Sequence, residues 1–157
     1  MIRFQVRAAV YVLFEKKGKI LMFRRKNTDW FDGYFNVPCG HIDGGESMPY
    51  AAAREAREEV GVTVSPKDLK LIQTAHRYNG KYEYLETYFL AKKWKGEPRL
   101  NEEELSEELS WFEMESLPEN TIPYIREAIL SYLSGHNYCE YNFKDGKPVE
   151  IGYTAPN

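Results

Sequence analysis

The sequence lacks the features that define several protein classes. Its two cysteines, Cys39 and Cys139, are far apart and form no Cys-x-x-Cys pair, which argues against a disulfide framework and against a zinc site. The longest apolar run, residues 8–14, is much shorter than the roughly 20 residues of a membrane-spanning helix. The first residues lack the apolar block of a signal peptide. We therefore expect a cytoplasmic protein that does not enter a membrane.

A large excess of positive charge is also missing. The chain has 21 Lys and Arg residues against 24 Asp and Glu residues, so its net charge of −3 argues against a surface that coats nucleic acid. The acids are unevenly spread, because nine of the 24 lie in two short segments within residues 46–59 and 102–108. With 157 residues, of which 43% are hydrophobic, the chain is long and apolar enough for one folded domain.

Hydrophobic patterning predicts an α/β fold with a mixed sheet and helices packed on it. The continuous apolar run at residues 6–14 indicates a strand covered on both faces. Further strands are predicted at residues 20–23, 69–74, 82–94 and 109–112, and a late hairpin at Asp145-Gly146. Residues 27–45 contain five glycines or prolines, which predicts a long loop, and such loops are usually functional.

Two helices are predicted, at residues 47–60 and 123–133. In the first, Ser47 can cap the N-terminus and Gly61 can end the helix. In the second, Ile125, Ile129 and Leu133 share one stripe that we expect to face the core.

The first helix carries an unusual cluster of glutamates. Glu55, Glu58 and Glu59 fall within about 100° of one helix face, given about 3.6 residues per turn. Like charges at these spacings repel, and the helix dipole near its C-terminus disfavours anions. A bound cation would offset these effects, and hard carboxylate oxygens suit Mg²⁺ or Mn²⁺. The alternative is a solvated charged face in which Arg54 pairs with Glu58.

The loop before this helix completes a recognisable pattern. Gly40, Glu46 and residues 54–62 together match every position of GX5EX7REUXEEXGU, where U is an apolar residue. This pattern is the Nudix box, and the chain resembles the Nudix hydrolases, in particular their MutT-related branch. MutT-like proteins commonly carry Pro-Gly-Gly at the entrance of the box, whereas this chain has Pro38-Cys39-Gly40.

The resemblance implies a fold and a domain arrangement. It implies an α/β/α sandwich with a mixed β-sheet between helices. We expect a Nudix hydrolase domain over residues 1–135, with its box at residues 40–62. The tail, residues 136–157, lies outside the resemblance and is expected to belong to the same domain.

The resemblance also implies a divalent metal site with Mg²⁺, or alternatively Mn²⁺. By analogy with the family, Glu58 and Glu59 are principal metal ligands, and Glu55 binds metal or helps to deprotonate water. Arg54 then orients these carboxylates by ion pairing. The backbone carbonyl of Gly40 is a further ligand, and Glu46 has a supporting role.

Residues outside the box are assigned by the resemblance with open alternatives. For the general base we select Glu104 from the acidic run at residues 102–108, with Glu103 and Glu102 next; a solvated acidic loop is the alternative for each. Four residues are candidate substrate contacts, and for Asn120 a helix cap is the rival explanation: Arg25, Asn36, Tyr78 and Asn120. Aromatic residues in the long loop, such as Trp30, could stack on a base or pack in the core.

Three functions follow from the resemblance. The leading interpretation is Mg²⁺-dependent hydrolysis of a nucleoside triphosphate, including an oxidised or noncanonical one, to a monophosphate and pyrophosphate. The second is hydrolysis of another nucleoside diphosphate compound, such as a nucleotide sugar or a dinucleoside polyphosphate. The third is a nucleotide-sensing domain without turnover. In each case the partner is a small nucleotide, and a homodimer is an open expectation because family members are often dimers.

Overall fold

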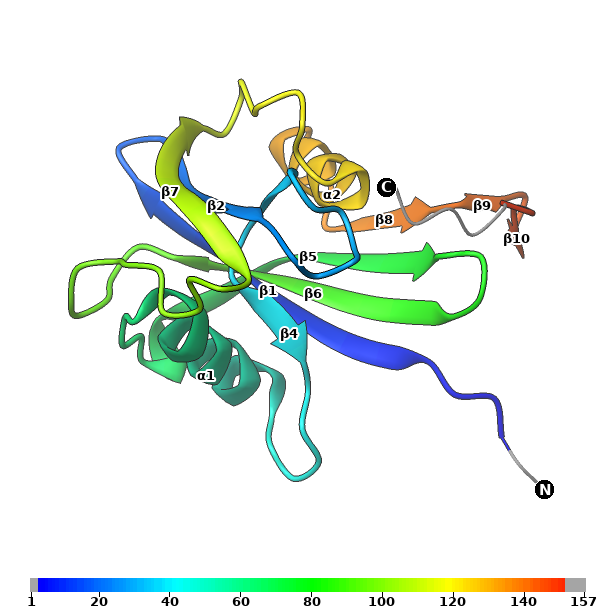
Figure 1. Ribbon diagram of the computed structural model, residues 1–157. Helices are drawn as coiled ribbons and strands as arrows, with labels where there is room; N and C mark the ends of the chain where they lie inside the picture. The colour runs from blue at the N-terminus through cyan, green and yellow to red at the C-terminus, as the bar shows by residue number, and fades with distance from the viewer. Residues whose placement is uncertain (1–2, 152–157) are drawn as a thin grey trace.

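The fold is described from a computed structural model, which describes residues 3–151. An eight-stranded mixed sheet lies between two helices, and α1 (Met48–Val60) and α2 (Pro123–Leu133) occupy its opposite sides (Figure 1). The predicted α/β sandwich with a mixed sheet between helices is therefore confirmed. Within the described range, no helix is long and apolar enough to cross a membrane.

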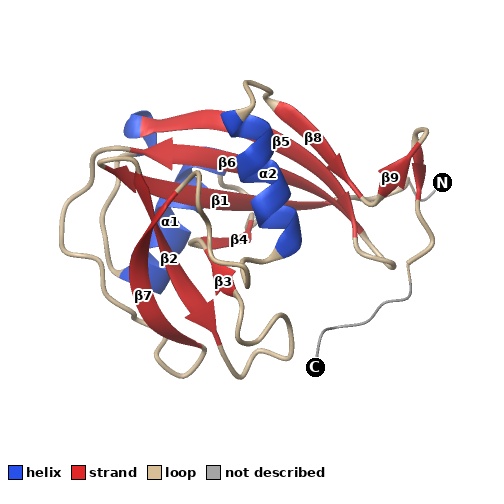
Figure 2. Cartoon of the chain, turned by 90° about the horizontal axis from the view of Figure 1, so that it is seen from above, coloured by secondary structure: helices blue, strands red, loops and turns tan. Residues whose placement is uncertain are grey.

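The sheet is ordered β3-β2-β1-β6-β5-β8, with β4 paired to β1 and β7 paired to β2. Its parallel pairs are β1 with β6 and β5 with β8, and the remaining pairs are antiparallel. Figure 2 shows α2 lying across β5, β6 and β1. The strands are β1 (Arg7–Lys16), β2 (Lys19–Arg25), β3 (Phe35–Asn36), β4 (Cys39–His41), β5 (Leu69–Tyr78), β6 (Glu83–Ala91), β7 (Ser106–Glu113) and β8 (Tyr138–Tyr141).

Strand β1 is covered on both faces, as predicted. Alternate side chains of a strand point to opposite faces, so Tyr11 and Leu13 join the cluster under α2, whereas Val12 and Phe14 join the cluster under α1. All four side chains are buried. This central strand therefore ties the two cores together.

One edge of β1 changes its partner partway along the strand. Residues Ala9–Tyr11 pair with β4, whereas Glu15 and Lys16 pair with β2 at the far end. The long loop of residues 27–45 thus contains the two short strands β3 and β4 rather than being without regular structure. Strand β4 carries Gly40 and is joined to α1 by the loop of residues 42–47.

Both helices begin or end close to the predicted positions, but their caps differ. Ser47 occupies the N-cap position of α1 without a side-chain capping hydrogen bond, and Gly61 ends the helix with φ 68°. In α2 the N-cap is Ile122, so the alternative that Asn120 caps this helix is wrong. Ile125 and Ile129 are buried as predicted.

Other boundaries were predicted less well. Leu133 was expected on the buried stripe of α2 but is 39% exposed, so this stripe faces the core at Ile125 and Ile129 and not at the end of the helix. Strand β5 continues four residues beyond the predicted end at Thr74, and β7 is also longer than predicted. The tail forms the hairpin β9 (Phe143–Lys144) and β10 (Lys147–Pro148), as predicted, but its strand β8, which joins the main sheet beside β5, was not predicted.

The left-handed conformation of Gly61 supports a prediction. Replacing it with alanine should destabilise the protein by about 1 kcal/mol, because a Cβ disfavours positive φ. The new Cβ would also lie 3.2 Å from the Asn101 side chain. Denaturant unfolding measures the change. Gly135→Ala is the matched control, since Gly135 has φ +85° and no neighbour within 4 Å, so it reports the backbone cost alone. An unchanged stability in both variants would contradict the prediction.

Candidate active site

The site begins at the contact between β4 and α1. A Cβ built on Gly40 would lie 2.1 Å from both Cδ and Oε1 of Glu55. The carboxyl group of Glu55 therefore occupies the space that any side chain at position 40 would need. Glycine is required here by this close approach, and its backbone φ is not in the left-handed region.

Arg54 holds three carboxylates of the box at once. Its Nε and Nη2 donate to the two oxygens of Glu46 at 3.1 and 2.7 Å. Its Nη1 donates to Glu55 Oε1 at 2.7 Å and to Glu58 Oε2 at 3.2 Å. The hydrogen bonds from Arg54 hold the pKa of the Glu46 carboxyl below its usual value. This arrangement agrees with the orienting role implied for Arg54 and the supporting role implied for Glu46.

Glu59 reaches the entrance of the box from the next turn of α1. The backbone N–H of Cys39 donates to Glu59 Oε2 at 2.7 Å. Burial raises the pKa of the Glu59 carboxyl well above its usual value, although the Cys39 hydrogen bond opposes this. Burial also raises the pKa of Glu55, while Arg54 opposes it, and the charges of Glu55 and Glu59 disfavour each other. Burial and neighbouring negative charge therefore both disfavour the ionised form of the acids in this site.

These acids have the donor chemistry that Mg²⁺ prefers, but they do not converge on one point. Among residues 3–151, no three His, Cys, Asp or Glu side chains are arranged to hold a metal ion between them. Glu58 is turned towards Arg54 and Glu59 towards the amide of Cys39. The Glu58 side chain is 48% exposed, so it has room to rotate away from Arg54. Glu58 therefore belongs both to the ion pair with Arg54 and to the predicted set of metal ligands.

The second acidic segment approaches the box through Glu102. This residue is partly buried, and its charge contributes to the raised pKa values of Glu55 and Glu59. Burial raises the pKa of Glu102 itself, and Glu104 and Glu58 raise it further. Glu104 is exposed, and its backbone carbonyl accepts a hydrogen bond from Asn27. Of these two acids, Glu102 is therefore the one whose charge acts on Glu55 and Glu59, and a general base in this segment stays a prediction.

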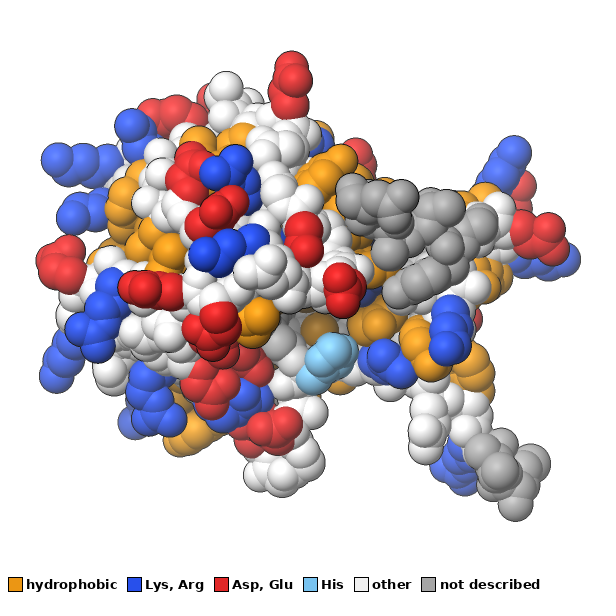
Figure 3. All heavy atoms as spheres, in the orientation of Figure 1, with side chains coloured by type: hydrophobic (Ala, Val, Ile, Leu, Met, Phe, Trp, Pro, Cys, Tyr) orange, Lys and Arg blue, Asp and Glu red, His pale blue; other side chains and the backbone are white. Residues whose placement is uncertain are grey.

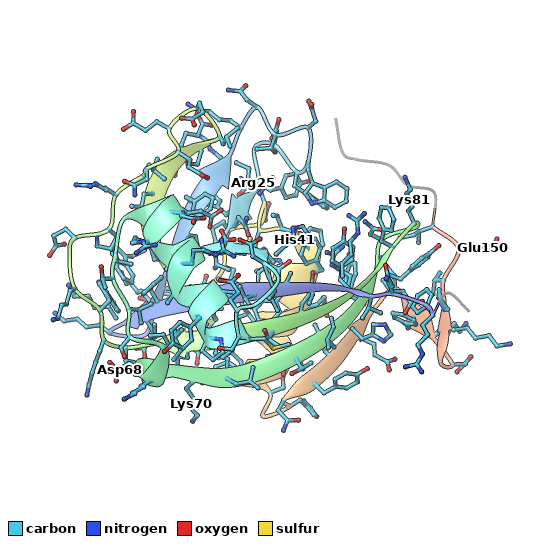
Figure 4. The ribbon with its side chains drawn as sticks, turned by 90° about the horizontal axis from the view of Figure 1, so that it is seen from below. Arg25, His41, Asp68, Lys70, Lys81 and Glu150 are labelled. Atoms are coloured by element: carbon cyan, nitrogen blue, oxygen red, sulfur yellow. The ribbon has the colours of Figure 1, made fainter. Side chains whose placement is uncertain are left out.

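Next to the box lies a cavity of about 320 Å³. Cys39, Gly40 and His41 form one side of it, and Arg77, Tyr84 and Tyr124 line it from β5, β6 and α2. Figure 4 shows Arg25 and His41 side by side at this cavity. In Figure 3, acidic side chains gather over α1 and the loop before it. The cavity therefore places aromatic rings and cationic groups beside the acids of the box.

Of the four predicted substrate contacts, the structure brings only Arg25 to the cavity. Its Nε donates to the backbone oxygen of Trp30 at 2.8 Å. The other three do not line the cavity, and the side chain of each forms a hydrogen bond elsewhere. Asn36 is 1% exposed and accepts the N–H of Val37; Tyr78 donates to the carbonyl of Gly80, and Asn120 to that of Gly33.

The buried ion pair between Arg77 and Glu86, beside the cavity, was not predicted from the sequence. Arg77 Nε and Nη2 lie 2.8 and 2.7 Å from Glu86 Oε1, and Glu86 is 0% exposed. The guanidinium lies between two tyrosine rings, with Cζ 4.1 Å from the centroid of Tyr84 and 4.0 Å from that of Tyr124. A single acid in the apolar strand Tyr84–Ala91 was the one available signal, because a carboxylate is rarely buried unless it is paired.

Comparison with known proteins places the chain in one family. The family model described as the NUDIX domain matches residues 3–132. A MutT NUDIX hydrolase from Burkholderia pseudomallei superposes with a TM-score of 0.74 at 26% identity, over 81% of this chain and 98% of that chain. The 8-oxo-dGTP diphosphatase of Escherichia coli is 26% identical over 130 residues, which cover 82% of this chain and 96% of that protein.

The chain is also similar to a protein whose name gives a different activity. The ADP-ribose pyrophosphatase of Methanocaldococcus jannaschii is 29% identical over 110 residues, or 70% of this chain. The match spans 63% of the length of that protein. The chain is thus similar to relatives whose names give different substrates. Because the family model covers most of its length, this chain belongs to the Nudix hydrolase family.

Proposed function

We propose that the protein hydrolyses a nucleoside triphosphate, in the presence of Mg²⁺, to a nucleoside monophosphate and pyrophosphate. One observation carries the proposal: Glu55 and Glu59 contact Gly40 and Cys39, which also line the cavity with aromatic walls. Cys39 and Gly40 therefore contact the carboxylates that would bind the metal on one side and line the pocket that would hold a flat ring on the other. A nucleotide with its polyphosphate chain has the complementary chemistry.

The residues of the box take separate roles in this proposal. Glu58, Glu59 and Glu55, with the carbonyl of Gly40, would hold Mg²⁺. The metal supplies charge neutralisation of the phosphates and lowers the pKa of bound water. Arg54 keeps Glu55 and Glu58 in position, and Glu46 in turn fixes Arg54 through both carboxylate oxygens.

A proton must leave the attacking water, and the acids with raised pKa values are suited to accept it. A base works best when its pKa lies near the working pH. Burial moves the pKa of Glu102 in that direction, and Glu102 acts electrostatically on the box acids. We therefore propose Glu102 as the base ahead of Glu104.

A second substrate class is supported by a relative. The similarity to an ADP-ribose pyrophosphatase favours compounds in which a nucleoside diphosphate is linked to another group. The products separate the two functions, because a triphosphate yields a monophosphate and pyrophosphate, whereas a linked compound yields two phosphorylated products. Purified protein with Mg²⁺ should be tested on triphosphates, nucleotide sugars, ADP-ribose and dinucleoside polyphosphates. Release of no product from any of them would refute hydrolysis and leave a sensing role.

Neutralising one metal ligand should abolish turnover. We expect Glu58→Gln to lower kcat by at least about 100-fold, because a neutral amide binds Mg²⁺ weakly while the fold is retained. Steady-state kinetics with varied Mg²⁺ measure the change. Glu113→Gln is the control, since Glu113 forms an exposed pair with Lys19 at 3.6 Å, and it should leave kcat within about twofold. An unchanged rate in Glu58→Gln would remove this residue from the metal site.

Adding one methyl group at the box glycine should also abolish activity. Gly40→Ala places a Cβ where the Glu55 carboxyl group lies, so that group must move away from the cavity. We expect kcat to fall by about 100-fold or more, because small displacements of catalytic groups have effects of that size. Gly44→Ala is the control, since a Cβ there meets nothing within 4 Å. Equal activity of the two variants would show that the Gly40 contact does not position Glu55.

Glu59 should stabilise the protein only when a metal is bound. When folding raises the pKa of a carboxyl, the protein loses stability as the pH rises from about 4.3, the pKa in the unfolded chain, through the pKa in the folded protein. The loss arises because the folded state then holds a buried charge. At pH 7 without metal, Glu59→Gln should therefore raise the free energy of unfolding by about 1 kcal/mol or more.

Thermal unfolding at pH 7 and pH 4.5, with and without Mg²⁺, measures this effect. The stability that Glu59→Gln adds at pH 7 should be smaller at pH 4.5, where the carboxyl of the wild type is more often protonated. Mg²⁺ should raise the Tm of the wild type more than that of the variant. A lower Tm of the metal-free variant at pH 7 would contradict the sign.

A further inference from the structure

The cavity beside the box has flat walls. Trp30, Tyr84 and Tyr124 contribute aromatic rings to its lining. Aromatic side chains favour stacked or edge contacts with another ring, and stacking alone tolerates any base. The walls therefore indicate a nucleobase, and the polar groups between them determine which base is preferred.

Arg77 presents donors to this cavity. Glu86 engages the side of the guanidinium that bears Nε and Nη2, through Oε1. A guanidinium has five N–H donors, so the end-on pair on Nη1 and Nη2 takes no part in this contact. The Cζ atom of Arg77 lies over the rings of Tyr84 and Tyr124, 4.1 and 4.0 Å from their centroids, which restrains the guanidinium further. Because Arg77 lines the cavity and is only 4% exposed, its orientation is set before any ligand binds.

Asn79 adds a donor at the same cavity. Its Oδ1 accepts the backbone N–H groups of Lys81 and Tyr82, at 3.0 and 2.7 Å. This pairing fixes which end of the amide is the acceptor, so Nδ2 is the end that remains for a ligand. Asn79 lines the cavity together with Arg77. Arg77 at the end of β5 and Asn79 in the turn after it thus both offer N–H donors.

We propose that Arg77 and Asn79 select a base with two adjacent acceptors on one edge, as guanine has at O6 and N7. This inference rests on the proposed function, because it specifies the base of the nucleotide hydrolysed at that site. A planar pair of arginine donors matches O6 and N7 of guanine bidentately. Adenine carries an amino donor in place of O6, so its edge would set a donor against Arg77 and leave buried donors unpaired.

The same reasoning argues against oxidised guanine. In 8-oxoguanine N7 carries a hydrogen and is a donor, so the acceptors O6 and O8 of this edge are separated by a donor and no longer form an adjacent pair. The proposal therefore ranks guanine above its oxidised form. In this respect the chain would differ from the 8-oxo-dGTP diphosphatase to which it is similar.

The test compares kcat/KM for GTP, ITP, ATP and 7-deaza-GTP with Mg²⁺. ITP keeps O6 and N7 without the 2-amino group, so it should match GTP within about threefold, whereas ATP should be about 10- to 100-fold poorer. The 7-deaza analogue, which lacks the N7 acceptor, should lose roughly tenfold. Equal rates for ATP and GTP, or a preference for ATP or 8-oxo-GTP, would overturn the proposal.

Two variants assign the preference to the named side chains. Arg77→Lys keeps a positive charge beside Glu86 but loses the planar donor pair, so the GTP/ATP ratio should fall to within about threefold. Asn79→Asp keeps the acceptor of the turn and replaces the Nδ2 donor with an oxygen, which should shift the ratio towards ATP. Thermal unfolding checks that both variants fold. An unchanged ratio in both folded variants would overturn the assignment.

The outcome for the inference is separable from that for the proposed function. If the protein cleaves triphosphates without preference among the bases, the function stands and the inference fails. If it cleaves none of them, the proposed function fails. Calorimetric binding of GDP against ADP, with Mg²⁺, then decides the base preference on its own: tighter binding of GDP by about tenfold supports it, and equal binding refutes it.

Discussion

The close approach of α1 to the box glycine is the constraint on which the rest of the site depends. The carboxyl group of Glu55 lies where a side chain at position 40 would be, and Glu59 accepts the amide of Cys39 one residue earlier. Because β4 is paired with β1, these two contacts connect the helix to the centre of the sheet. Arg54 then links Glu55 to the loop through Glu46. The acids are therefore held by the same contacts that join helix, loop and sheet.

The change of partner along β1 explains why two different chemistries meet at one place. Strand β4, which carries the first residues of the box, pairs with β1 at Ala9–Tyr11, in the middle of the sheet. On the α1 side of this junction are the glutamates, and on the α2 side are the rings of Tyr84 and Tyr124 with Arg77 between them. A flat ring with a polyphosphate tail is a ligand that spans such a junction. If the protein acts as proposed, the central strand separates the groups that recognise the base from those that hydrolyse the phosphate chain, while keeping them adjacent.

The sequence predicted local features better than long-range ones, for physical reasons. The helix at residues 47–60 and the spacing of the box depend on neighbouring residues, so they could be read directly. The second half of β5 was not predicted, and the burial of Arg77 in it depends on Glu86 in another strand. Strand β8 likewise depends on pairing with β5. Which glutamate of residues 102–108 approaches the box depends on the path of the loop, and composition carries no record of that path.

The two faces of the sheet differ in what they contribute. Under α1 the core is apolar, with Val10, Val12 and Phe14 fully buried, so this face supplies hydrophobic stabilisation. Under α2 the core includes the Arg77–Glu86 pair, and within the described residues Glu86 Oε2, the Tyr88 hydroxyl and the Gln73 amide are buried without a hydrogen-bond partner. Buried polar groups of this kind cost stability compared with apolar packing. Tyr11 and Arg77 both donate to Glu86 and both line the cavity, so the polar part of this core is continuous with the cavity wall, and the stability it costs fixes the position of Arg77 there.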